Sequence, residues 1–159
     1  MEVIFYPETK ECEKNVKQYQ FYGWQTADIR NADGLTPCDL YDLLRNIWCE
    51  YTCAPRMRDK WSKDCPTVGQ CSITAFLVQD LFGGKVCGVT TASGNTHCYN
   101  VVDGCTFDLT SEQFPNETLS YENNPEQFRE DHFSKEEKLL RYEYLKCELG
   151  KKINGQMSK

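Results

Sequence analysis

The chain has 159 residues, of which 40% are hydrophobic and 26% are charged, and its formal net charge at pH 7 is −6. This length suits one domain with a substantial core, because a chain of this size buries roughly 70% of its unfolded surface on folding. The acidic balance argues against a nucleic-acid partner, since phosphate binding needs clustered Lys and Arg. The sequence holds no run of about 18 apolar residues, which argues against a membrane-spanning helix.

Ten cysteines are many for this length and would suggest a disulfide framework in a secreted protein. The start of the chain, Met1 to Pro7, has neither a basic segment nor a long apolar one, so no signal peptide is visible. We therefore expect a cytoplasmic protein with reduced thiols. The sequence leaves its oligomeric state open.

Structural zinc and redox chemistry are alternative uses of these cysteines. Two sets could combine in a zinc site: Cys49, Cys53 and Cys65, or His97, Cys98 and Cys105. The spacing fits poorly, because no Cys-x-x-Cys pair occurs and the first two thiols also suit one face of a helix. We therefore predict no metal and no cofactor. A redox role, with Cys71 forming a disulfide to Cys65 or another thiol, stays open.

The N-terminal part of the chain is the hardest to interpret. Residues 1–35 are expected to form an extension of uncertain structure, with a short strand at Val3–Tyr6 and an aromatic cluster at Tyr19–Trp24 that covers a core. A helix then begins after the N-cap Thr36, with Pro37 in its first position. Apolar residues recur at helical spacing up to about Thr52.

The next helix is predicted to be the centre of the fold. Gly69-Gln70-Cys71 directly precedes the apolar stretch Ser72–Phe82, which closes on Gly83-Gly84. Because nearly every side of this helix is apolar, it should be buried rather than lie on the surface. The glycine pair supplies a left-handed helix end.

Three short strands follow, at Lys85–Thr91, Thr96–Val102 and Cys105–Thr110, with a two-residue hairpin turn at Asp103-Gly104. A last helix, Lys135–Leu149, is announced by the capping-box pattern Ser134 to Glu137 and ends at Gly150. Residues 151–159 are polar and expected to be a mobile tail. We thus predict a single α+β domain over residues 36–150, with a central buried helix packed on a small antiparallel sheet.

A Cys-His-Asp site is the chemistry that this order of elements favours. A thiol at a helix N-terminus feels the positive end of the dipole and free backbone N–H groups, which favour the thiolate and could bind an oxyanion. If Asp103-Gly104 forms the hairpin turn, Val102 faces Cys105 and Tyr99 faces Asp108. His97 and Asp108 then share a face, within reach of a hydrogen bond. With Asp108 on Nδ1, the imidazole would present Nε2 to the Cys71 thiol.

This helix-then-strands order resembles the papain/transglutaminase-like group of folds. The resemblance implies that Cys71 is the nucleophile, His97 the general base and acid, and Asp108 the orienting residue. The backbone N–H of Cys71 and a side chain such as Gln70 would form the oxyanion hole. Asn100 and Gln113 are further polar candidates for the pocket. Each also has a structural interpretation: Cys71 as a core thiol, His97 as a satisfied histidine, and Asp108 as a turn cap through Thr110.

A second resemblance covers the chain from about Thr36 to Leu149 and is to the YunG-type family of small uncharacterised bacterial proteins. The residues that carry it are Trp61-Ser62, Pro66, Gly69-Gln70-Cys71, Thr74-Ala75, Gln79-Asp80, Phe82-Gly83-Gly84, His97, Tyr99-Asn100, Asp108-Leu109-Thr110, Gln113-Phe114 and Arg141-Tyr142. Two departures are Cys98 and Tyr99, which stand where the family's histidine is typically followed by Tyr-Trp. The resemblance implies no substrate, because the family's activity is not established.

The sequence therefore favours a thiol-dependent hydrolase or acyl transferase acting on an amide, isopeptide or thioester bond of a peptide, protein or acyl substrate. Two alternatives remain. One is a non-catalytic papain-like binding or interaction domain, and the other is a cysteine-rich structural zinc or redox protein.

Overall fold

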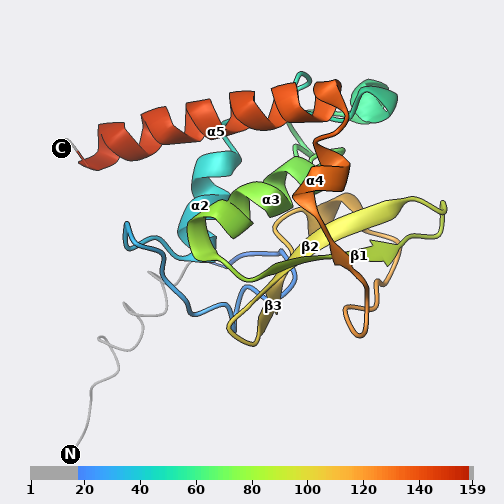
Figure 1. The fold of residues 1–159 in the computed structure, drawn as a ribbon, viewed down its shortest axis with the longest axis horizontal. Helices are drawn as coiled ribbons and strands as arrows, with labels where there is room; N and C mark the ends of the chain where they lie inside the picture. The colour runs from blue at the N-terminus through green and yellow to red at the C-terminus, as the bar shows by residue number, and fades with distance from the viewer. Residues whose placement is uncertain (1–17, 158–159) are drawn as a thin grey trace, which may run out of the picture.

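The computed structural model describes residues 18–157, so the strand predicted at Val3–Tyr6 lies outside the described residues. In chain order the elements are α2 (Pro37–Leu44), the 3-10 helix η1 (Pro55–Lys60), α3 (Cys71–Phe82), β1 (Lys85–Thr90), β2 (Thr96–Val102), β3 (Cys105–Phe107), the 3-10 helix η2 (Ser111–Gln113), β4 (Glu126–Gln127), α4 (Arg129–His132) and α5 (Glu136–Met157). The class is α+β. Figure 1 shows α5 lying across α3, with the sheet on the other side of α3.

Helix α2 begins as the sequence predicts but is shorter than expected. Thr36 and Asp39 form a reciprocal capping box, and Pro37 occupies the first helical position. The helix ends at Leu44 rather than near Thr52. Residues 45–52 form turns instead, because the Thr52 hydroxyl accepts from the backbone N–H of Cys49 and donates to its carbonyl, which closes the chain locally.

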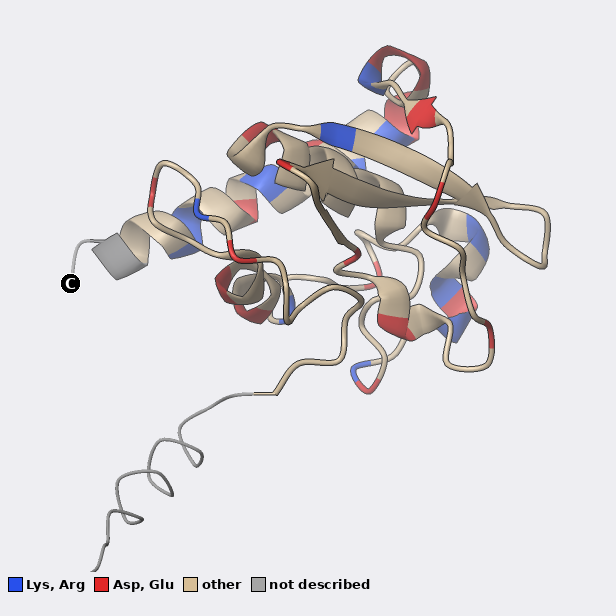
Figure 2. Cartoon of the chain, turned by 90° about the horizontal axis from the view of Figure 1, so that it is seen from below, with Lys and Arg blue, Asp and Glu red and all other residues tan. Residues whose placement is uncertain are grey.

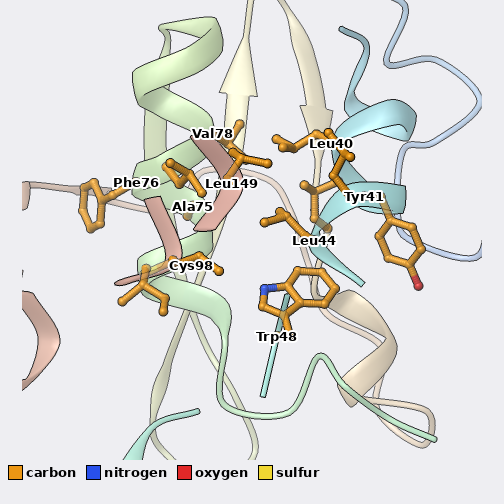
Figure 3. Packing of buried hydrophobic residues seen from close by; sticks show 14 of the residues in the cluster. Leu40, Tyr41, Leu44, Trp48, Ala75, Phe76, Val78, Cys98 and Leu149 are labelled. Atoms are coloured by element: carbon orange, nitrogen blue, oxygen red, sulfur yellow. The ribbon is translucent and has the colours of Figure 1, made fainter. Parts of the chain in front are cut away.

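Helix α3 is the centre of the core, as its all-round apolar character predicts. Residues Ile73–Val78 are all buried, between β2 on one side and α5 on the other. The Trp48 indole lies against this helix and donates a 3.0 Å hydrogen bond to the Thr74 hydroxyl. Figure 3 shows the packing of this core from labelled members of α2, α3, β2 and α5, among them Leu44, Ala75, Cys98 and Leu149.

The sheet is antiparallel with strand order β3-β2-β1-β4. The predicted hairpin is confirmed: Val102 pairs with Cys105, and the turn residues Asp103 and Gly104 have φ values of 49° and 80°, the positive pair that a type I′ turn requires. Strand β3 ends at Phe107, three residues before the predicted end at Thr110. Asp108 does not face Tyr99, because its backbone N–H donates to the Tyr22 carbonyl instead.

The C-terminal end of the described chain differs from the prediction, and the N-terminal end agrees with it. Helix α5 passes through Gly150 and continues to Met157, so the predicted helix end is wrong. Ser134 does not cap it, since its hydroxyl donates to the Asp131 carbonyl. At the other end the aromatic cluster does cover the core: Phe21 is fully buried against Tyr41. No helix within residues 18–157 is both long enough and apolar enough to cross a bilayer.

Candidate active site

Cys71 is the first residue of α3 and is partly exposed. The first turn of a helix has backbone N–H groups without intrahelical acceptors. Here the preceding residue, Gln70, makes no side-chain cap, because its Nε2 donates to the Cys49 carbonyl at 3.2 Å. The thiol therefore lies at a helix N-terminus whose N–H groups no N-cap side chain occupies.

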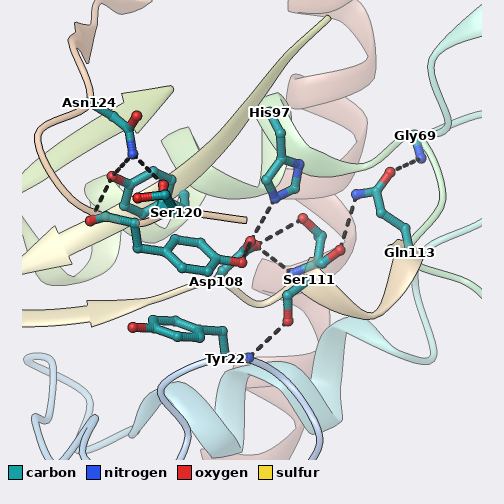
Figure 4. Close-up of polar contacts among 11 residues, drawn as sticks. Tyr22, Gly69, His97, Asp108, Ser111, Gln113, Ser120 and Asn124 are labelled. Atoms are coloured by element: carbon teal, nitrogen blue, oxygen red, sulfur yellow. Dashed lines mark hydrogen bonds and ion pairs between the residues drawn. The ribbon is translucent and has the colours of Figure 1, made fainter. Parts of the chain in front are cut away.

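Gly69 fixes how the chain enters this helix. It has φ +71°, its carbonyl accepts from the Ala54 N–H at 2.9 Å, and its own N–H donates to Gln113 Oε1 at 3.3 Å. A Cβ at this position would lie 2.4 Å from the Cys53 sulfur. Figure 4 shows the link from Gly69 to Gln113. The approach to Cys71 thus needs a glycine both for its conformation and for space.

His97, the second residue of β2, forms a buried pair with Asp108. Its Nε2 lies 2.6 Å from Asp108 Oδ2, and both side chains are about 1% exposed (Figure 4). The sequence-based expectation placed Asp108 on Nδ1, so the nitrogen assignment is corrected. The physical reason is the early end of the ladder: Asp108 lies beyond β3, where the distal nitrogen of the ring reaches it.

Asp108 is held by more than the imidazole. Its Oδ1 accepts from the Thr110 N–H and hydroxyl, and its Oδ2 also accepts from the Tyr121 hydroxyl at 2.8 Å. The Tyr121 ring stacks on Tyr22 with 3.9 Å between centroids. The turn-cap interpretation through Thr110 and the pairing with His97 therefore hold together, and two aromatic rings shield the carboxylate.

The Cys71 thiol interacts with the Cys98 thiol and with the His97 imidazole. The pKa of Cys71 lies well below its usual range, and the hydrogen bond with the Cys98 thiol is the largest cause. His97 also lowers this pKa, whereas burial raises it. The pKa of Cys98 is raised in turn by its contact with Cys71. Both directions follow from one arrangement, in which Cys98 donates and Cys71 carries the negative charge.

The pKa of His97 moves in the direction that favours the imidazolium. Burial lowers it, but the charge and hydrogen bond of Asp108, together with Cys71, outweigh burial and raise the pKa from 6.5 to about 10. Its Nδ1 is buried and makes no hydrogen bond within the described residues. Phe114 covers the ring edge-on, with centroids 4.8 Å apart.

Cys71 and His97 line one cavity of about 390 Å³, a volume in the range of small-molecule sites. Its walls come from η1, the start of α3, the β1–β2 turn, the end of η2 and the start of α5. The other lining residues are Ala54, Pro55, Arg56, Met57, Gly69, Ser72, Thr91, Ser93, Asn95, Thr96, Gln113, Phe114, His132, Lys135, Glu137, Lys138 and Arg141.

Of the three polar candidates, only Gln113 lines this cavity. Its Nε2 donates to the Thr110 carbonyl at 3.1 Å, which leaves the second hydrogen of the amide available. Gln70 is fully buried, and the Asn100 amide donates to the Ala75 carbonyl at 2.9 Å in the core. The structure brings neither Gln70, the expected oxyanion donor, nor the pocket candidate Asn100 to the lining of this cavity, because both amides donate to backbone carbonyls elsewhere.

Sequence reasoning missed several residues around the site. The sequence gives Cys98 as a candidate zinc ligand and as a departure from the family pattern, but not as a partner of Cys71, although a residue next to His97 on a strand points to the opposite face, where α3 lies. Lys135 and Lys138 flank Glu136 and Glu137 in sequence, a pattern that is typical of a solvated helix face and does not mark a site. Tyr121 lies in an Asn-rich loop with no periodic signal, so nothing local marks it.

The cysteines show no metal or disulfide arrangement within the described part of the chain. Nine of them are free thiols, including Cys49, Cys53 and Cys65. Over residues 18–157 no three His, Cys, Asp or Glu side chains cluster in a way that could hold a metal ion.

Comparison with known proteins places the chain in a family. The model of the YunG protein family matches residues 36–154, a span that contains Cys71, His97 and Asp108. The chain belongs to the YunG family. It is also 30% identical over 113 residues to a protein of Bacillus subtilis (strain 168) named "Uncharacterized protein YunG", which covers 71% of this chain and 90% of the relative.

The YunG assignment agrees with the resemblance found in the sequence and names no activity. No solved structure matches the chain. The function of this YunG-family protein therefore has to be argued from the cavity and the side chains around it.

Proposed function

We propose that this chain is a thiol-dependent hydrolase or acyl transferase of papain/transglutaminase-like type, with Cys71 as nucleophile, His97 as general base and acid, and Asp108 as the orienting residue. Its substrate would be an amide or thioester. One observation carries the proposal: a thiol at the start of a buried helix and a histidine in a buried bond to a carboxylate line the same cavity.

The chemistry follows from the roles of these groups. The Cys71 thiolate attacks the substrate carbonyl carbon, and the oxygen becomes an oxyanion near the first-turn N–H groups of α3 and the free amide hydrogen of Gln113. As the intermediate collapses to a thioester, the bond to the leaving amine or thiol breaks and His97 gives it a proton. Water or an acceptor amine then attacks the thioester, passes its proton to His97 and releases the Cys71 thiolate.

Asp108 supports these steps by orientation. Its bond to Nε2 leaves Nδ1 of His97 without a bond to the carboxylate, and we assign to Nδ1 the proton exchange with Cys71 and the substrate. Asp108 also stabilises the imidazolium that exists whenever the histidine holds the transferred proton. We include a cytoplasmic location in the proposal, supported by the nine described cysteines that form no disulfide.

The test is site-resolved alkylation by iodoacetamide at neutral pH, followed by mass spectrometry of each cysteine peptide. Cys71 should react at least about tenfold faster than Cys147, the exposed thiol on α5, because a thiol with a lowered pKa is largely thiolate at pH 7. His97→Asn should remove part of this advantage, because His97 also lowers the pKa of Cys71, while Cys147→Ser should leave the rate at Cys71 unchanged.

Turnover separates an enzyme from a binding domain. Incubation with an activated ester such as p-nitrophenyl acetate should acylate Cys71 in a burst, and the acyl group should then be lost to water. Asp108→Asn should slow both phases. Equal reactivity of Cys71 and Cys147, together with no acylation of Cys71, would leave the non-catalytic papain-like domain as the better account.

A further inference from the structure

The cavity around Cys71 is lined by cations, although the chain as a whole is acidic. Arg56 comes from η1, Lys135 precedes α5, and Lys138 and Arg141 lie on α5, while Glu137 is the only acidic residue of the lining. The chain carries a net charge of −6. Blue and red segments are interspersed over the molecule in Figure 2, so the basic lining is a local feature of the cavity.

Most of this positive charge is not neutralised. Arg141 is 3% exposed and pairs with Glu137 at 2.8 Å, which uses the one carboxylate of the wall. Its Nη1 donates to the Thr52 carbonyl, and its Nη2 makes no hydrogen bond within the described residues. Arg56, Lys135 and Lys138 form no ion pair with any residue between 18 and 157.

The cations also act on one another. Burial and the neighbouring Lys135 cation lower the pKa of Lys138, even though Cys98, Glu137 and Cys71 act in the other direction. Burial and Lys138 lower the pKa of His132, whose Nδ1 is buried with no hydrogen-bond partner in the described chain. Like charges that outnumber the anions beside them disfavour their own charged state, and a further anion in the cavity would relieve this.

We propose that the substrate of this site carries an anionic group, a carboxylate or a phosphate, which the Arg56, Lys135, Lys138 and Arg141 side chains hold while Cys71 reacts with the acyl carbon. This inference rests on the proposed function for the acyl step. The cavity volume of about 390 Å³ fits a small molecule or the end of a longer one. A nucleic acid fits poorly, since the net charge of −6 of the chain would repel a polyanion.

Two alkylating reagents that differ mainly in charge test the proposal. Iodoacetate is an anion and iodoacetamide is neutral, so the ratio of their rates at one thiol reports the local potential. At low salt this ratio should be about tenfold higher at Cys71 than at Cys147. It should converge on the Cys147 value as salt rises, because the screening length falls to about 3 Å at 1 M.

Charge variants locate the effect. The double variant Lys135→Gln and Lys138→Gln should lower the iodoacetate preference of Cys71, measured as the ratio of the iodoacetate rate to the iodoacetamide rate, by at least about threefold. Lys152→Gln is the matched control. It removes an exposed lysine of the same helix that is roughly 21 Å along the axis from Lys138, at about 1.5 Å per residue, and it should change neither rate.

Competition separates the two sources of the anion. Inorganic phosphate and glutarate are added separately during iodoacetamide labelling, and protection of Cys71 by one of them names the favoured group. Equal rate ratios at Cys71 and Cys147 in the wild type, with no protection by either anion, would overturn the anionic substrate. A different outcome is a high ratio of iodoacetate to iodoacetamide rates at Cys71 with an iodoacetamide rate no faster than that of Cys147. That outcome would overturn the role of Cys71 as nucleophile and would retain the anion site.

Discussion

Asp108 is the residue on which the candidate site depends most. Its two carboxylate oxygens accept hydrogen bonds from His97, from Tyr121 and from both the N–H and the hydroxyl of Thr110. A carboxylate this deeply buried needs such partners, because an unsatisfied buried charge costs several kcal/mol or more (a rough figure). Its charge and its bond to His97 are also the main causes that raise the histidine pKa.

Replacing Asp108 by Asn should therefore lower the pKa of His97. The neutral amide keeps a polar group beside Nε2 but removes the negative charge, so the pKa should fall from about 10 by about 1 to 3 pH units. The chain has two histidines, which makes the side-chain NMR titration simple to assign. His132 should titrate below 6.5 in both proteins, because burial lowers its pKa.

Tyr121→Phe is the matched control for this titration. It removes a 2.8 Å hydrogen bond to the same Asp108 oxygen without removing the charge. A carboxylate that loses a donor binds its remaining donor more strongly, so the pKa of His97 should stay the same or rise. A fall of the same size in Tyr121→Phe and Asp108→Asn would contradict the assignment of the effect to the charge of Asp108.

Cys98 should set the reactivity of Cys71 by hydrogen bonding. Since the Cys98 thiol is the largest cause that lowers the pKa of Cys71, Cys98→Ala should move the midpoint of Cys71 alkylation to higher pH. Cys98→Ser keeps an O–H donor at the same position and should retain most of the wild-type midpoint. The measurement is the iodoacetamide rate of the Cys71 peptide against pH, and identical midpoints for the Ala and Ser variants would exclude this role.

At the scale of elements, the sequence predicts best what depends on neighbours in the chain. The Asp103-Gly104 turn, the capping box at Thr36 and the all-apolar α3 are local signals, and the structure has all three. The predictions fail where a contact with a residue far away in sequence determines the local structure. Asp108 leaves the ladder for the Tyr22 carbonyl, a residue far away in sequence. That contact, which no local pattern shows, also determines which nitrogen of His97 the carboxylate reaches.

The entry into α3 gives a prediction on stability. Gly69→Ala should lower the free energy of unfolding by about 2–4 kcal/mol, because a non-glycine residue at φ +71° is strained and its Cβ would lie 2.4 Å from the Cys53 sulfur. Gly94→Ala separates the two causes. Gly94 has φ +89° but nothing within 4 Å of an added Cβ, so it should lose only about 1 kcal/mol from the backbone strain.

Urea unfolding at equilibrium measures both variants. A Gly69→Ala loss no larger than that of Gly94→Ala would show that the chain before Cys71 can move to accept a side chain. In that case the position of the thiol would be less fixed than the contacts of Gly69 with Ala54 and Gln113 suggest.

At the scale of the molecule, the cavity exists only when distant segments meet. Its lining runs from Ala54 to Arg141 and draws on η1, α3, the β1–β2 turn, η2 and α5. The places of Cys71 and His97 were predictable, because each lies on a strongly patterned element. The cations of the lining were not predictable. Lys135 and Lys138 reach the cavity only because α5 crosses over the start of α3, as Figure 1 shows.

The Cys71–His97 pair should leave a mark on the pH dependence of stability. The folded-state pKa of His97 is raised, so its contribution is fully present below 6.5 and is lost as pH rises through about 10. The folded-state pKa of Cys71 is lowered, so its contribution is present above the ordinary thiol pKa and is lost as pH falls through the folded value. Between about pH 6.5 and about pH 8.5 the two slopes oppose each other, and this pair should make little net change in wild-type stability.

Cys71→Ser removes one of the two slopes and exposes the other. Asp108 still raises the pKa of His97 in this variant, so its free energy of unfolding should fall as pH rises, by up to about 1.4 kcal/mol per pH unit over this range. The double variant Cys71→Ser with His97→Asn should lack that slope while all other titrating groups stay the same. Urea unfolding of the three proteins at about pH 7 and about pH 8.5 gives the comparison. Parallel pH profiles for the single and double variants would show that His97 does not hold its proton through the bond to Asp108, because removing the histidine would then remove no pH-dependent stability.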